Sequence, residues 1–222
     1  MESVASIGGL ENYAKALELG YFQEMLEKHI DLVGRRLLEN EVIPTAEKLY
    51  SIFETHTEWL SKGKAGKSVE LGHNLLIATD QYHFILYHRV VERTADVNLT
   101  QDLVNSLCLS YPNQIASLSL DKGFYSKANK EAIKDRIPLL VMPKKGKRNK
   151  EEDKEERDAE FVKLRNKHSA VESNINQLEH NGMGVCRDKT LKGFKRYVSL
   201  SILAYNMHRL GKYICEKGKK SP

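Results

Sequence analysis

The chain has 222 residues, of which 41% are hydrophobic and 29% are charged, and its formal net charge is +5. These values are ordinary for a globular protein with a packed core. No apolar run approaches the roughly 20 residues that span a bilayer, and the stretch "MESVASIGGLENY" lacks the basic and apolar regions of a secretion signal. We therefore expect a cytoplasmic protein.

The cysteines and the overall charge further limit the classes of protein that fit this sequence. Cys108, Cys186 and Cys215 are far apart and include no close-spaced pair, which argues against a disulfide framework and a structural zinc site. A pI near 8.9 favours a polyanionic partner only weakly, because many domains are equally basic. The local distribution of charge is therefore more informative than the total.

The first half of the chain predicts a helix followed by a β-hairpin. Residues 10 to 40 carry apolar side chains at spacings of three or four, with Glu and Lys between them, and Pro44 ends this pattern. The block "SKGKAGKSVELG" reads as a flexible basic loop. Residues 69 to 77 then alternate, "TDQYH" forms a turn, and "FILYHRVVE" returns as the second strand.

The second half alternates between strands and helices. A helix over residues 101 to 109 leads to the strand "IASLSL" and then to Asp121, and a helix over residues 127 to 134 leads to the short strand "IPLLVMP". An apolar stripe from Phe161 to Leu178 predicts one helix, which "HNGMG" breaks. Residues 190 to 214 form a last helix, apolar over much of its circumference and so expected to be buried against the sheet. This order predicts a mixed α/β sheet.

A charged tract, "KKGKRNKEEDKEERDAE", separates the last strand from these helices. Its first part is basic and its second part is mostly acidic, which is typical of a solvated loop that leads into an exposed helix start. The basic part could also contact phosphate groups of DNA.

Two carboxylates occupy positions that suit a shared site. Asp121 follows the carboxyl end of a strand, where ligands bind in open α/β sheets. Glu172 lies about 70° from the centre of its apolar stripe and so borders the buried face of its helix. Two unpaired acids repel each other, and a divalent ion with oxygen ligands is the simplest reason to bring them together. Each acid alone is equally consistent with a solvated strand or helix terminus.

Several long segments resemble the carboxyl-terminal half of bacterial insertion-sequence transposases of the DDE type. They are "LSLDKGFYSKANKEAI", "LLVMPKKGK", the stretch from "HSAVESNINQLEH" to "MHRLG", and the stretch from "SIFETHTEWL" to "VVERTAD". The resemblance implies an RNase H-like mixed sheet flanked by helices. It also implies metal-dependent cleavage and strand transfer of double-stranded DNA at insertion-sequence ends, with Mg²⁺ or Mn²⁺ as cofactor. In this family two aspartates and one glutamate hold two metal ions, and the resemblance places the second aspartate at Asp121 and the glutamate at Glu172.

The sequence departs from the family pattern at the first aspartate, which normally lies on a strand upstream of a helical insertion. No predicted strand between Met1 and Asn40 carries an aspartate. We therefore expect a helical insertion remnant over residues 1–45, an incomplete catalytic domain over residues 46–215 without its first catalytic strand, and a basic tail over residues 216–222. Glu54, just before the hairpin, is the leading candidate for the third metal ligand. Asp96 ranks behind it, because two strand spacings separate it from the place of the first strand.

A second departure concerns the helix that carries the glutamate. Many related transposases have tyrosine, arginine, glutamate and lysine in this signature, whereas here the corresponding positions are Arg165, His168 and, beyond Glu172, Glu179. Arg165 and His168 could support the site from its periphery, and His168 could orient Glu172 or contact phosphate. As a member of the apolar stripe, His168 is also compatible with a hydrogen-bonded core position.

Two functions remain open at this point. One is a metal-dependent DNA transposase, expected to be inactive as an isolated fragment. The other is a non-catalytic remnant that binds DNA, or that binds an intact transposase subunit or a second copy of itself. The residues expected to contact DNA are the basic ones in the two loops: Lys62, Lys64, Lys67, Lys144, Lys145, Lys147 and Arg148.

Overall fold

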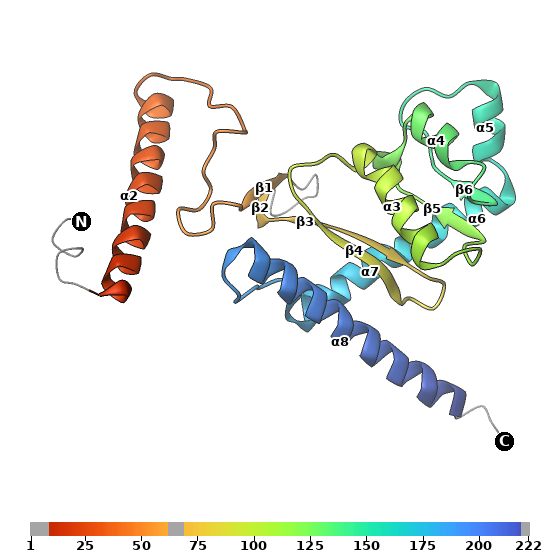
Figure 1. Cartoon of the computed structure of the whole chain (residues 1–222). Helices are drawn as coiled ribbons and strands as arrows, with labels where there is room; N and C mark the ends of the chain where they lie inside the picture. Colours follow the sequence, from red (N-terminus) through yellow and green to blue (C-terminus); the bar gives the residue numbers. More distant parts are fainter. Residues whose placement is uncertain (1–8, 62–68, 219–222) are drawn as a thin grey trace. The chain divides into compact units, whose positions relative to one another are not determined.

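The computed structural model describes residues 9–61 and 69–218, and Figure 1 shows the order of its elements. The chain divides into two compact units. The first comprises the residues up to His73 together with Lys189–Leu191, and the second comprises Asn74–Asp188 and the residues from Lys192 onward.

The first unit contains one long helix and one hairpin. Helix α2 covers Leu10–Leu37, as the periodicity predicted, and buries Leu32. Strand β1 (Glu58–Ser61) pairs antiparallel with β2 (Val69–Gly72). The sequence predicted one strand over residues 69 to 77, and this is wrong. Gly72 has a φ of 153°, which residues with a Cβ rarely adopt, so the first strand ends there and a new one starts at Asn74.

The second unit is built around two separate strand pairs. Strands β3 (Asn74–Thr79) and β4 (Ile85–Val91) form the predicted antiparallel hairpin. Strands β5 (Ser117–Ser119) and β6 (Leu139–Val141) pair in parallel. The connecting elements are α3 (Asp96–Ser110), the 3₁₀ turn η1 (Lys122–Phe124) and α4 (Lys127–Ile133).

Four α-helices and one π-helical turn follow β6 in the described part of the chain. They are α5 (Lys150–Glu156), α6 (Ala159–Lys167), α7 (Ser169–Leu178) and the long α8 (Thr190–Gly218), with a π-helical turn, η2 (Glu179–Met183), after α7. The predicted single helix from Phe161 to Leu178 is therefore two helices, because the chain turns at His168. There the amide of His168 bonds to the carbonyl of Arg165, and the amide of Val171 bonds to the carbonyl of His168, so both bonds span three residues instead of four.

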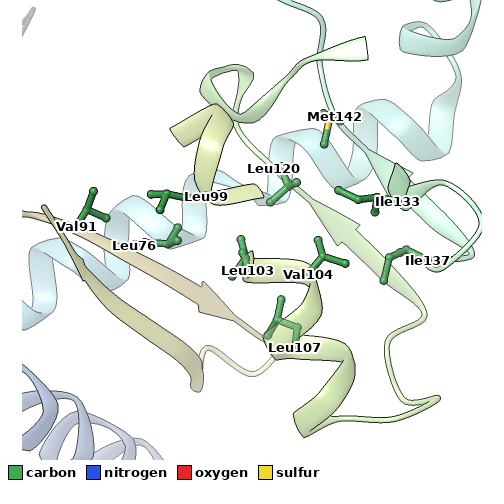
Figure 2. Close-up of a cluster of buried hydrophobic side chains, with 10 residues drawn as sticks. All are labelled: Leu76, Val91, Leu99, Leu103, Val104, Leu107, Leu120, Ile133, Ile137 and Met142. Atoms are coloured by element: carbon green, nitrogen blue, oxygen red, sulfur yellow. The ribbon is translucent and has the colours of Figure 1, made fainter. Parts of the chain in front are cut away.

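Helices cover both faces of the β3–β4 hairpin, as alternation along a strand requires. Leu76 lies in one apolar cluster with α3, whereas its neighbour Ile77 lies in a second cluster with α7 and α8. Figure 2 shows the first cluster, in which α3 bridges the hairpin and the β5–β6 pair; its members are Leu76, Val91, Leu99, Leu103, Val104, Leu107, Leu120, Ile133, Ile137 and Met142. The result is a mixed α/β unit compatible with an RNase H-like fold, as predicted, although its described strands form separate pairs and not the single mixed sheet that the sequence predicted.

Candidate carboxylate site at the end of β5

Asp121 lies immediately beyond the carboxyl end of β5. The amide of Leu120 still bonds to the carbonyl of Val141, at 2.9 Å, and the chain then leaves the sheet at Asp121. The carbonyl of Asp121 accepts a hydrogen bond from the amide of Phe124, which closes the turn η1. Asp121 is exposed, and it lies at the strand end, where the sequence predicted it.

A second carboxylate, that of Asp96, lies beside this turn. Asp96 is the first residue of α3, and its side chain approaches Gly123 so closely that a Cβ on Gly123 would lie 2.7 Å from Asp96 Oδ2. Asp96 is exposed, yet its pKa is raised, mainly because partial desolvation at the start of α3 disfavours the ionised carboxylate and further because Asp121 is negatively charged. The structure therefore brings Asp96 and Asp121 together, although the sequence ranked Asp96 behind Glu54.

Buried hydrogen bonds fix the start of α3 against the segment after Asp121. The Thr100 hydroxyl, which is fully buried, donates to the carbonyl of Phe124 at 3.0 Å. The side-chain amide of Asn129 donates to the carbonyl of Val97 at 2.7 Å and to that of Phe124 at 3.3 Å. These bonds make the approach of Asp96 to Gly123 a consequence of the packing. The sequence analysis missed Thr100 and Asn129, since a single buried polar residue leaves no periodic signal.

Glu172 lies on the exposed side of α7. The same helix buries Leu178 and Asn174, and the side chain of Asn174 accepts a hydrogen bond from Tyr205 at 2.9 Å. His168 is half-buried at the junction of α6 and α7, and Arg165 lies in the last turn of α6. Within residues 9–61 and 69–218, no group of three or more His, Cys, Asp or Glu side chains is arranged to hold a metal ion.

Glu54 belongs to a hydrogen-bonded chain within the first unit. Both of its carboxylate oxygens accept from the backbone amide of Thr190, at 3.1 and 3.0 Å, and Oε2 also pairs with His56 at 2.8 Å. His56 Nδ1 lies 2.8 Å from His73 Nε2, and His73 Nδ1 lies 3.0 Å from a carboxylate oxygen of Glu58. Glu54 would have to give up some of these bonds to bind a metal.

The basic loop after β6 is partly neutralised by α5. Lys144 forms an ion pair with Glu152 at 2.7 Å, which raises the pKa of Lys144, and Arg148 pairs with Glu156 at 2.9 Å. Lys145 and Lys147 are exposed and so remain available to a polyanion. The other three lysines expected to contact DNA, Lys62, Lys64 and Lys67, lie outside the described residues.

The fold and the two carboxylates together define the class of protein. It is a mixed α/β domain in which Asp121, at the end of the parallel β5–β6 pair, and Asp96, at the start of α3, lie at the same turn. A family model described as "Transposase DDE domain" matches residues 40–207. The chain therefore belongs to the DDE transposase family, as the resemblance predicted. Comparisons with curated proteins and with solved structures give no match. No helix among the described residues is long and apolar enough to cross a membrane.

Proposed function

We propose that the chain is the part of an insertion-sequence transposase that supplies Asp121 and Glu172 to metal-dependent cleavage and strand transfer of DNA. The observation that carries this proposal is the position of Asp121 at the end of β5 with a second carboxylate, Asp96, beside it. Membership of the family supports the reaction class. Arg165 and His168, on the helices before Glu172, are proposed to support its carboxylate or to contact a DNA phosphate.

The chemistry of the site fits a divalent cation. Magnesium and manganese prefer carboxylate oxygens, and both Asp96 and Asp121 present them. The negative charge of Asp121 contributes to the raised pKa of Asp96, and a bound Mg²⁺ or Mn²⁺ would offset this repulsion. We propose that Asp121 and Asp96 hold such an ion, with Glu172 contributing at the position of the family's glutamate. When bound, the ions make a water or a DNA 3′ hydroxyl nucleophilic and stabilise the departing oxygen.

The small number of carboxylates at this site indicates that the isolated chain cleaves DNA poorly. None of the six strands in the described part of the chain contains an aspartate. The family's first aspartate, which normally lies on a strand, has no counterpart there. Magnesium is held loosely by one or two carboxylates unless substrate phosphates complete its coordination. We therefore propose that Asp96 supports binding of an ion, whereas efficient two-metal catalysis requires a further ligand.

Metal binding and cleavage can be tested separately. Titration with Mn²⁺, followed by electron paramagnetic resonance, should show a site that Asp121→Ala and Asp96→Ala both weaken. Asp102→Ala is the matched control, because Asp102 lies on the same helix, is 63% exposed and pairs with Arg89. Equal affinity in all four proteins would refute the site. A nicking assay should show little cleavage, and robust cleavage abolished by Asp121→Ala and Glu172→Ala would refute the proposal that a ligand is missing.

A second candidate function is a remnant that binds DNA without cutting it. The exposed Lys145 and Lys147, together with Lys62, Lys64 and Lys67, favour this function. Phosphate contacts weaken steeply as salt rises. Fluorescence anisotropy with a labelled duplex should therefore give affinity that falls between low and moderate salt. Affinity that is flat over this range, or undetectable at low salt, would eliminate the DNA-binding function.

A further inference from the structure

The loop that joins β6 to α5, residues 144–149, is folded back onto that helix. The ammonium group of Lys144 lies 2.8 and 2.7 Å from the two carboxylate oxygens of Glu152. The backbone amide of Lys144 donates to Glu156 Oε1 at 2.7 Å, and Arg148 Nε pairs with the same oxygen at 2.9 Å. These two basic and two acidic residues, Lys144, Arg148, Glu152 and Glu156, are hereafter called the α5 latch.

The α5 latch lies at the end of the β5–β6 pair where Asp121 leaves it. The two strands run parallel, so their carboxyl ends meet at one edge. Asp121 is the second residue beyond β5, and Lys144 is the third residue beyond β6. The pKa of Lys144 is raised, first by its bond to Glu152 and further by the nearby phenol of Tyr125, the residue after η1. A DNA phosphate that reaches an ion on Asp121 therefore arrives beside the α5 latch.

We propose that the α5 latch is an autoinhibitory contact, in which two carboxylates hold Lys144 and Arg148 until phosphates of DNA displace them. This inference rests on the proposed function, because both candidate functions require the chain to bind DNA. Lysine and arginine make the same charge-assisted hydrogen bonds to carboxylate and to phosphate oxygens. Helix α5 is acidic at five of its seven positions, so it presents a row of negative charge to the loop, as a DNA strand would.

The burial of Glu156 shows that the closed latch has an internal cost. Glu156 is 7% exposed, and its Oε2 is buried without a hydrogen-bond partner among the described residues. A carboxylate oxygen that has lost water and gained no donor raises the free energy of the closed form. Opening would return Oε2 to water and so offset part of the loss of the ion pairs.

The second pair of the latch is also one that DNA can replace. The side chains of Lys144 and Glu152 are 27% and 24% exposed, and ion pairs that solvent reaches contribute only modestly to stability. A polyanion that offers several phosphates can therefore compete with Glu152 and Glu156 for the two basic side chains.

The other acids of α5 provide matched controls. Glu155 pairs with Lys130 on α4, at 2.6 Å, and Glu151 is exposed on the same helix. Glu151→Gln, Glu155→Gln and Glu152→Gln each remove one negative charge, but only Glu152→Gln acts on the α5 latch. Glutamine at position 152 can keep the capping box with Asn149, so α5 should still form in that variant.

The test is fluorescence anisotropy of the whole chain with a labelled DNA duplex. Glu152→Gln should tighten binding about fivefold, the scale of one partly exposed ion pair that no longer has to be broken. Glu156→Gln should also tighten binding. Glu151→Gln and Glu155→Gln should change the affinity less, which separates the latch from the effect of net charge. Circular dichroism checks that each variant is folded.

Lys144→Met shows whether the gain comes from the released lysine. In the Lys144→Met background, Glu152→Gln should give no gain beyond that of Glu151→Gln. In the Glu152→Gln background, Lys144→Met should reduce the slope of log affinity against log salt by about 0.9, which corresponds to one phosphate contact. A gain that survives Lys144→Met, or a slope that does not change, would overturn the proposal.

The remaining outcomes distinguish this inference from the proposed function. Equal affinities of Glu152→Gln and Glu151→Gln would overturn the autoinhibitory role, as would weaker binding by Glu152→Gln, which would mean that the ion pairs position the loop for DNA. Both results leave the proposed function intact, since the unaltered chain still binds the duplex. Binding that is undetectable in every protein at low salt would instead eliminate the DNA-binding function and, with it, the autoinhibitory role.

Discussion

Asn129 is expected to be critical for the packing that holds Asp96 beside Asp121. It is 6% exposed, and its amide donates to two backbone carbonyls, at 2.7 and 3.3 Å. Asn129→Asp keeps the shape but replaces the donor with an acceptor and a charge. Each lost bond costs about 1 kcal/mol, and a buried charge without a partner costs roughly 3–5 kcal/mol. The penalty for the buried charge already includes the loss of its partners, so we expect the free energy of unfolding to fall by about 3–5 kcal/mol at pH 7.

Asn129→Leu provides the comparison, since it removes the same donors without adding a charge. The Thr100 hydroxyl lies 3.0 Å from the carbonyl of Phe124 and 3.2 Å from that of Val97, and its single proton can still satisfy one of the two. Asn129→Leu should therefore lower the free energy of unfolding by about 1–2 kcal/mol. Gln101→Ala, which removes only a 3.3 Å bond to the side chain of Asn129 from an exposed residue, should cost less.

Urea denaturation followed by circular dichroism measures all three variants. Burial raises the folded pKa of the new carboxyl group in Asn129→Asp above its unfolded value, which is about 3.9. The loss of unfolding free energy is therefore present above this unfolded pKa and shrinks as the pH falls toward it. If Asn129→Asp loses no more unfolding free energy than Asn129→Leu, or if its loss does not change with pH, the account of the Asn129 hydrogen bonds is refuted.

Three further predictions follow from the packing and the charges. Leu103→Ala, at a position 1% exposed in the cluster of Figure 2, should cost about 3–5 kcal/mol in urea unfolding, and a cost below that of Leu109→Ala would contradict the assigned core. The raised pKa of Asp96 means that its ionised form destabilises the fold at neutral pH. Asp96→Asn should therefore raise the thermal midpoint at pH 7 and have no effect below pH 3.8, the ordinary value; a lower midpoint at pH 7 would exclude this cause. In the first unit, His73→Leu removes hydrogen bonds of 2.8 and 3.0 Å from a side chain that is 2% exposed. Hydrogen exchange of the β1 and β2 amides should show that the free energy of opening falls by about 1–3 kcal/mol. Unchanged protection of these amides would show that this chain of hydrogen bonds does not stabilise the strand pair.

Much of the local structure follows from the sequence alone. Periodicity is a property of neighbouring residues, and it placed α2, α4, α8 and strand β4 close to their observed bounds. Asp121 could be placed at the end of β5 because a strand direction and a turn signal suffice for that position. Family membership was also accessible, since long matching segments extend over most of the chain.

The tertiary structure decided which of these residues meet. Asp96 and Asp121 are 25 positions apart in the sequence, and they become neighbours only because α3 packs across both strand pairs and is bonded to the segment after β5. The basic and then acidic composition after β6 did not reveal that Glu152 and Glu156 fold back onto Lys144 and Arg148, which partly neutralises two of the residues expected to contact DNA. The apolar circumference of α8 predicted burial, but burial depends on what surrounds a helix. Only the packing shows that the hairpin covers one face of α8, whereas Leu203 and Met207 on another face are more than half exposed.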